Sequence, residues 1–111
     1  MTVSEICEAL GGELQCEGDK GREITGATAG DLLSFIMGTA PEGAAWVTVQ
    51  AHLNVAAVAV LKDLPLIIIA SGRKAPDDLI ERCKTENIAI LSVTETLYAT
   101  CVKLAALGLA G

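Results

Sequence analysis

The chain has 111 residues, of which 51% are hydrophobic and only 3% aromatic, and its formal net charge at pH 7 is −6. A chain of this length can bury a core of its own, so we expect one domain over residues 1–111. Residues 1–45 hold eight acids and two bases, whereas residues 46–111 hold six of each. An acidic chain with few aromatic residues lacks the basic face that nucleic acids require, which excludes them as partners.

We expect a cytoplasmic protein that does not enter a membrane. Met1–Ser4 leads directly into an acidic helix and does not have the pattern of a secretory signal peptide. The longest apolar run, Val55–Leu61, is too short to span a bilayer. No two cysteines have the C-x-x-C spacing, so we expect reduced thiols rather than disulfides or metal ligands, with no metal and no cofactor, at Cys7, Cys16, Cys83 and Cys101.

The chain is expected to begin with a short helix followed by a half-exposed strand. Thr2 and Glu5 have the spacing of a capping box, which predicts that the helix starts beside them. Glu13–Glu17 alternates polar and apolar residues, which predicts a strand with Leu14 and Cys16 pointing inward.

A second short strand and a second helix come next. Ile24–Thr28 is predicted to be the strand, after a turn rich in glycine. Thr28 and Asp31 are spaced so that they can cap a helix that runs to Met37 and stops at Gly38.

From residue 45 onward, strands and helices alternate regularly. Ala45–Val49 is predicted to be a strand, and Asn54 is predicted to cap the helix Val55–Lys62, which is apolar nearly all round. Leu66–Ala70 is a continuous apolar run rich in isoleucine, which is typical of a strand buried on both faces.

The last third of the chain repeats this alternation. Pro76 marks the start of a helix with acids in its first turn, and Asn87 is a good left-handed stop. Ala89–Val93 is a further buried strand, and Thr94 is predicted to cap a closing helix that runs from Glu95 to about Leu107. We therefore predict a small three-layer α/β domain, with a mostly parallel sheet of about five strands flanked by helices.

In an open parallel sheet, ligands bind beyond the carboxyl ends of the strands. Three such ends lead into helix starts, where free N–H groups attract anions, and this predicts a site for a small anionic metabolite or nucleotide. The candidate residues are Gln50, His52, Asn54, Ser71, Gly72, Arg73, Lys74, Thr94 and Thr96.

Each of these residues also has a purely structural explanation. Ser71-Gly72 can be a turn, Arg73 and Lys74 solvated charges, and Thr94 a helix cap. His52 is the single imidazole and has no Asp, Cys or second His nearby in the chain, which is typical of a polar loop residue. There is no phosphate-binding glycine loop, nucleophile elbow or metal-ligand cluster, and we predict no catalytic residue.

Four stretches resemble a known family. They are TVSEICEALGGELQCEG, AAWVTVQAHLNVAAVAV, LPLIIIASGRKAPDDLIERCKTENIAIL and SVTETLYATCVKL. Residues 45–108 resemble the DRTGG domain, and the whole chain is similar to the N-terminal domain of HPr kinase/phosphorylase. Two motifs depart from the family: its Asp-Arg pair is replaced by Gln50-Ala51-His52, and its Thr-Gly-Gly by Ala70-Ser71-Gly72.

The resemblance implies an accessory, regulatory or dimerising domain, because the kinase's phosphate-binding loop lies in a separate domain. Relatives in phosphotransacetylases and in CBS-domain pyrophosphatases also lie outside the catalytic parts. Our first hypothesis is a non-catalytic regulatory or sensor module that homodimerises and binds a small anion. The second is an interaction subunit that docks, without a ligand, on a larger enzyme complex of redox or kinase-related function. The third is a small enzyme that uses His52 with Thr94 or Thr96.

The homodimer is expected from the closing helix. Two helices are apolar nearly all round, and a domain of this size can bury one of them, so surplus apolar surface is expected on the other. The closing helix is terminal and rich in small residues, which favours an interface about a two-fold axis. The candidate interface residues are Leu97, Cys101, Leu104, Ala105 and Leu107.

Overall fold

The computed structural model describes residues 1–111 and contains five helices and five strands in the predicted order. The elements are α1 (Val3–Leu10), β1 (Glu13–Cys16), β2 (Gly26–Ala29), α2 (Leu33–Thr39), β3 (Ala44–Thr48), α3 (Asn54–Lys62), β4 (Leu66–Ile69), α4 (Asp77–Thr85), β5 (Ala89–Ser92) and α5 (Leu97–Ala106).

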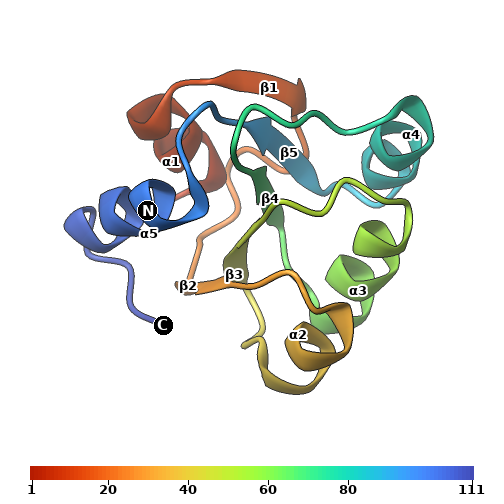
Figure 1. The fold of residues 1–111 in the computed structure, drawn as a ribbon, viewed down its shortest axis with the longest axis horizontal. Helices are drawn as coiled ribbons and strands as arrows, with labels where there is room; N and C mark the ends of the chain where they lie inside the picture. Colours follow the sequence, from red (N-terminus) through yellow and green to blue (C-terminus); the bar gives the residue numbers. More distant parts are fainter.

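The strands form one sheet in the order β1-β5-β4-β3-β2 (Figure 1). Strands β2, β3, β4 and β5 are parallel, and β1 pairs antiparallel with the outer edge of β5. The mostly parallel five-stranded sheet predicted from the sequence is therefore confirmed.

The helices form a layer on each face of the sheet. Figure 1 shows α2, α3 and α4 along one side and α1 and α5 along the other. The chain moves one strand along the sheet at each step from β2 to β5, and right-handed crossovers in a constant direction put their helices on the same face. After β5 the chain leaves to the opposite face, where α5 packs beside α1.

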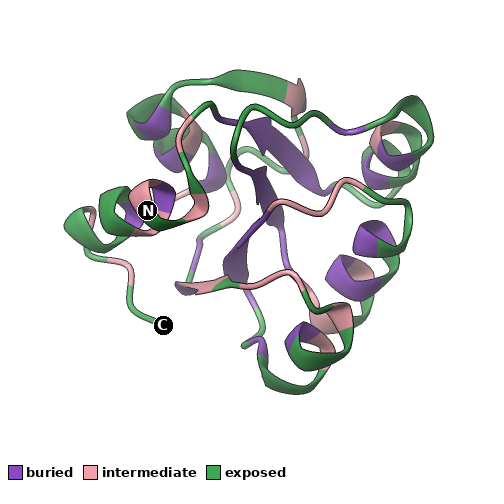
Figure 2. Ribbon diagram, viewed as in Figure 1, coloured by how far each residue is buried: buried purple, intermediate pink, exposed green.

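The core lies on both faces of the three central strands, whose residues are all buried (Figure 2). Trp46, Ile67 and Ile90 face the layer of α2, α3 and α4, whereas Val47, Ile68 and Leu91 face α1 and α5. Continuous apolar runs were predicted to be doubly buried strands, and the structure shows why: each of their faces is covered by helices.

Three local predictions in the first half of the chain were wrong. Thr28 lies inside β2 and does not cap a helix, because β2 continues to Ala29 in register with β3. The Asp31 carboxylate also caps no helix; its Oδ1 accepts hydrogen bonds from Thr48 Oγ1 at 2.9 Å and from the Val49 N–H at 2.8 Å. The Leu14 side chain is exposed rather than inward, because the pairing of β1 with β5 shifts register between Leu14 and Cys16.

Two predicted helix caps are replaced by neighbouring residues. Asn54 is the first residue of α3 and Leu53 holds the N-cap position, where no side chain caps the helix; the Asn54 N–H donates to Nδ1 of His52 at 3.1 Å. α5 begins later than predicted, since Thr96 rather than Thr94 accepts the hydrogen bond from the Ala99 N–H.

The sequence placed Leu104 in a dimer interface, and this was wrong. Leu104 is only 2% exposed and packs in the core between α5 and the sheet. Leu97, Cys101 and Leu107 are half-buried against the same core, and only Ala105 of the five candidates is exposed. The inward face of α5 therefore packs against the core of its own chain.

An ion pair between Arg22 and Asp63 links the segment before β2 to the C-terminal end of α3. The Arg22 guanidinium makes two hydrogen bonds to the Asp63 carboxylate, at 2.6 and 3.2 Å. The hydrogen bond from Arg22 lowers the pKa of Asp63 from its ordinary value of 3.8.

All four cysteines are free thiols. Cys16 and Cys83 are buried, and burial raises the pKa of the Cys83 thiol to about 12, so this thiol is protonated at neutral pH. Every helix in the fold is too short or too polar to span a membrane.

We predict that Leu104→Ala lowers the free energy of unfolding by about 2–5 kcal/mol, because it leaves a cavity in the core. The control, Val102→Ala, lies half-exposed on the same helix and is expected to change it by no more than about 0.5 kcal/mol. Urea denaturation measures both. Equal effects of the two substitutions would contradict the burial of Leu104.

We predict that Asp63→Asn mainly affects stability above pH 4. Because the folded pKa lies below 3.8, the ionised carboxylate stabilises the fold above that value, and the contribution is lost as pH falls through the lower folded pKa. Both side chains are more than a third exposed, so the loss at pH 7 is at most about 1 kcal/mol. Denaturation at pH 7 and pH 2.5 tests this; a difference between the two proteins that grows on acidification would contradict it.

Candidate ligand site at the carboxyl edge of the sheet

The four parallel strands end at one edge of the sheet, where their loops lead into α2, α3, α4 and α5. β4 and β5 are neighbours, yet α4 and α5 cover opposite faces. In open α/β sheets, a crevice for ligands opens where neighbouring strands send their connections to opposite sides. The fold therefore places its candidate site between the ends of β4 and β5.

A tight turn follows β4 at this point. The Arg73 N–H donates to the Ala70 carbonyl at 3.3 Å, and Ser71 and Gly72 between them have φ of 62° and 73°. Positive φ at both central residues is the mark of a type I′ turn. Ser71 adopts it at an energetic cost that glycine avoids, so the turn requires support from its surroundings.

The loop after β5 supplies that support. The Ser71 N–H donates to the Glu95 carbonyl at 2.7 Å, and the Gly72 N–H donates to the Val93 carbonyl at 2.9 Å. These two hydrogen bonds bridge the crevice between β4 and β5. The N–H groups of Ser71 and Gly72 are thus already paired and are not available to an anion.

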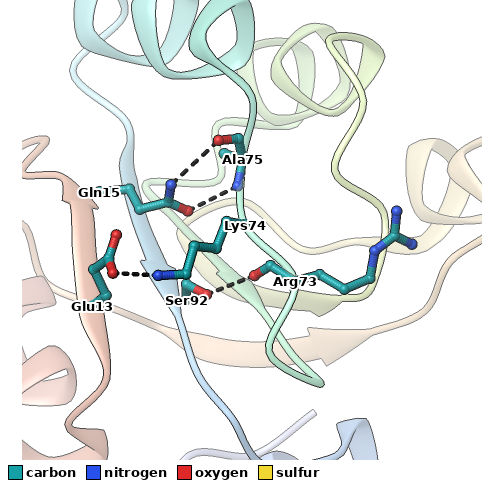
Figure 3. A network of polar contacts seen from close by, with 6 residues as sticks. All are labelled: Glu13, Gln15, Arg73, Lys74, Ala75 and Ser92. Carbon is teal, nitrogen blue, oxygen red and sulfur yellow. Dashed lines mark hydrogen bonds and ion pairs between the residues drawn. The ribbon is translucent and has the colours of Figure 1, made fainter.

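Beyond the turn, the chain crosses the end of β5 and is fastened to β1 (Figure 3). Ser92 Oγ donates to the Arg73 carbonyl at 2.6 Å. Ala75 exchanges two hydrogen bonds with the side-chain amide of Gln15, one to Oε1 at 2.8 Å and one from Nε2 at 3.3 Å. The Lys74 ammonium lies 2.5 Å from Glu13 Oε1.

Arg73 is the exception in this network. Its carbonyl is bonded, but its side chain extends away from the other five residues drawn in Figure 3. Lys62, Arg73 and Lys84 are the bases that make no ion pair, and of these only Arg73 lies at the carboxyl edge. The edge thus presents one free guanidinium on a fixed backbone.

The polar groups of the loop between β3 and α3 also form hydrogen bonds within the chain. Gln50 Nε2 donates to the Asp31 carbonyl at 3.2 Å, and its N–H donates to Thr48 Oγ1 at 3.1 Å. The His52 ring accepts a hydrogen bond from the Asn54 N–H, and Asn54 begins α3 with an exposed side chain. These residues hold the β2–α2 and β3–α3 loops together rather than leaving a set of free ligand groups.

The two candidate threonines after β5 are similarly engaged. Thr94 Oγ1 donates to Glu95 Oε2 at 3.2 Å, and Thr96 caps α5. Glu95 also pairs with Lys103 at 2.9 Å, and this hydrogen bond lowers the pKa of Glu95. A carboxylate at this position would repel an anion, although Lys103 offsets its charge.

The cavities of the chain lie elsewhere. One of about 330 Å³ opens between α1 and β1, and another of about 360 Å³ opens between β1 and α4. None of the nine candidate ligand residues lines a cavity. No group of three or more His, Cys, Asp or Glu side chains is placed to hold a metal. The carboxyl edge is therefore a shallow surface.

Sequence analysis missed three residues that shape this edge, namely Glu13, Gln15 and Asp31. Glu13 and Gln15 are polar positions of a strand whose partner could not be identified from the sequence. Their roles follow from the pairing of β1 with β5, which brings residues about 60 positions apart into contact. The capping pattern at Asp31 was noticed but assigned to the wrong partner.

No family model matches this sequence, and no curated protein has a matching sequence. Among solved structures, the chain is similar to the CBS and DRTGG domains of the regulatory region of Clostridium perfringens pyrophosphatase, which was crystallised with its activator diadenosine tetraphosphate. The TM-score is 0.74 and the sequence identity 16%, over 98% of this chain and 47% of that one. The chain thus shares this fold and spans about half the length of that structure.

We predict that Gln15→Ala lowers the free energy of unfolding by about 1–3 kcal/mol, because it leaves the N–H and carbonyl of the buried Ala75 unpaired. Glu13→Gln breaks only an exposed ion pair and should cost less than about 1 kcal/mol. Denaturant titration compares the two. A larger loss from Glu13→Gln would show that the network does not depend on the amide.

Proposed function

We propose that the chain is a non-catalytic regulatory module that homodimerises and binds a small anionic ligand, such as a nucleotide phosphate, at its carboxyl edge. The observation that carries this proposal is Arg73, a free guanidinium on a turn whose backbone is held from three sides. A cation on a prearranged loop loses little conformational freedom on binding. Guanidinium groups also match phosphate oxygens in a bidentate geometry.

The fold supports a regulatory role. It is shared with the regulatory region of a pyrophosphatase that binds the anionic activator diadenosine tetraphosphate. At 16% identity the likeness concerns the fold, so the ligand class is our proposal for this chain. The family motifs quoted from the sequence point the same way. Our proposal treats residues 1–111 as one cytoplasmic DRTGG-like domain, also similar to the N-terminal domain of HPr kinase/phosphorylase.

A single monomer offers too few contacts for tight binding. One exposed charge pair contributes about 0.2–1 kcal/mol, whereas a dissociation constant of 1 mM already requires about 4.1 kcal/mol. The ligand site therefore needs groups from a second surface, either a second subunit or a neighbouring domain. This makes dimerisation part of the proposal.

The second candidate function is an interaction subunit that docks on a larger enzyme. It is favoured by exposed apolar side chains on the layer of α2 and α3, among them Leu32, Leu61 and Phe35, which is 63% exposed. Such a module would need no ligand of its own. Ligand-dependent stabilisation separates the two functions.

We predict that diadenosine tetraphosphate or tripolyphosphate raises the melting temperature of the protein. A ligand at about a hundred times its dissociation constant stabilises the folded state by about 2.7 kcal/mol. Arg73→Ala should lower this gain by up to about 1 kcal/mol, the contribution of one exposed charge pair. Lys74→Ala is the matched control and should retain it, because Glu13 holds the Lys74 ammonium.

Differential scanning calorimetry with and without each polyanion measures this effect. Equal stabilisation of the Arg73→Ala and unmodified proteins would contradict the assigned role of Arg73. Absence of any stabilisation by either probe would favour the interaction subunit instead.

A further inference from the structure

The outward face of α5 is apolar along its whole length. Tyr98 is 80% exposed and Val102 50% exposed, and Ala105 and Ala106 are exposed in the next turn. Residues three and four apart lie on one side of a helix, so these four side chains form a single stripe, the α5 stripe. It lies opposite the buried residues Thr100 and Leu104.

Helices α1 and α4 of the same chain face solvent differently. The exposed side chains of α4 include Asp77, Asp78, Glu81, Arg82 and Lys84, and α1 exposes Glu5 and Glu8. A surface helix normally carries its charges on the face away from the core. α5 is thus apolar at the positions where α1 and α4 are charged.

Charge also distinguishes the α5 stripe as a surface for a second copy. The chain carries a net charge of −6, so two copies repel each other over most orientations. α5 contains no acid, and its one base, Lys103, is paired with Glu95 of the same chain. The repulsion between two copies is therefore low where their α5 stripes meet.

An apolar hollow of about 200 Å³ lies beside the stripe. Its walls come from α5, from β2 and from the chain end, which returns to β2 through a hydrogen bond from the Ala27 N–H to the Ala110 carbonyl at 2.9 Å. Cys101, Ala105 and Leu109 form the side of the hollow nearest the stripe.

We propose that the α5 stripe packs antiparallel against the same stripe of a second copy, with each Tyr98 ring entering the hollow of the other subunit. α5 spans Leu97–Ala106, so a two-fold axis through its middle passes beside Val102. The same axis puts Tyr98 opposite Ala105 of the partner subunit, at the mouth of the hollow. A large aromatic side chain thus meets a small one, twice per dimer.

This inference rests on the homodimer of the proposed function and assigns its interface. The surface of Leu32, Phe35 and Leu61 is the less suitable one for a second copy. Asp31 and Glu42 flank it and Lys62, beside Leu61, is its one base, so the surface is negative on balance and two copies of it repel each other.

Sedimentation equilibrium of the full chain tests the proposal. Tyr98→Ala should raise the dissociation constant of the dimer at least about thirtyfold, the equivalent of the 2 kcal/mol that defines an interface hot spot. Phe35→Ala is the matched control, an exposed aromatic on the opposite layer, and should leave the constant unchanged. Ala105→Trp, which fills the hollow, should also split the dimer.

Because Tyr98 and Phe35 are exposed, neither alanine variant should change the melting temperature of the monomer. A dimer that survives both Tyr98→Ala and Ala105→Trp overturns the interface, and a dimer lost only in Phe35→Ala moves it to α2. A monomer at 100 µM in the unmodified protein overturns the interface and the homodimer together. The failures are distinguishable, because a dimer that survives both substitutions overturns only the interface, whereas a dimer that no polyanion stabilises overturns only the ligand site.

Discussion

The structure depends on one constraint, the pair of backbone hydrogen bonds from Ser71 and Gly72 across the ends of β4 and β5. The right-handed crossover from β4 to β5 puts α4 on one face, whereas α5, which follows the last strand, lies on the other, and this would leave a crevice between the two strands. The turn after β4 closes that crevice with its own N–H groups. Gln15 and Ser92 then fix the rest of the loop, so that Arg73 alone faces outward.

Because the polar groups at the carboxyl edge of the sheet are paired with one another, this edge alone does not form a ligand pocket. A chain whose polar loop groups bind one another has little left to surround a ligand, and an exposed guanidinium contributes modestly on its own. Two apolar surfaces, on α5 and on the α2–α3 layer, are the places where we propose that a second chain binds. A regulatory module that works through assembly is consistent with all three features.

The sequence predicted the α/β class, the element order and the mostly parallel sheet, because runs such as Leu66–Ala70 are typical of strands covered on both faces. It failed where a residue's role is set by a partner far along the chain. The register shift that exposes Leu14, the capture of Asp31 by β3 and the pairing of Gln15 with Ala75 arise from tertiary contacts. Leu104 was misplaced because composition shows that a helix is apolar without showing which face meets the core.

Amide hydrogen exchange of Ser71 and Gly72, followed by NMR in the ligand-free protein, tests the central claim most directly. The hydrogen bonds to the Glu95 and Val93 carbonyls should slow exchange of both amides at least about a hundredfold relative to an unstructured loop, as expected for bonds that open only through local unfolding. Exchange at the unstructured rate would show that the crevice is open, that these N–H groups are free to bind an anion, and that the account of a self-closed edge is wrong.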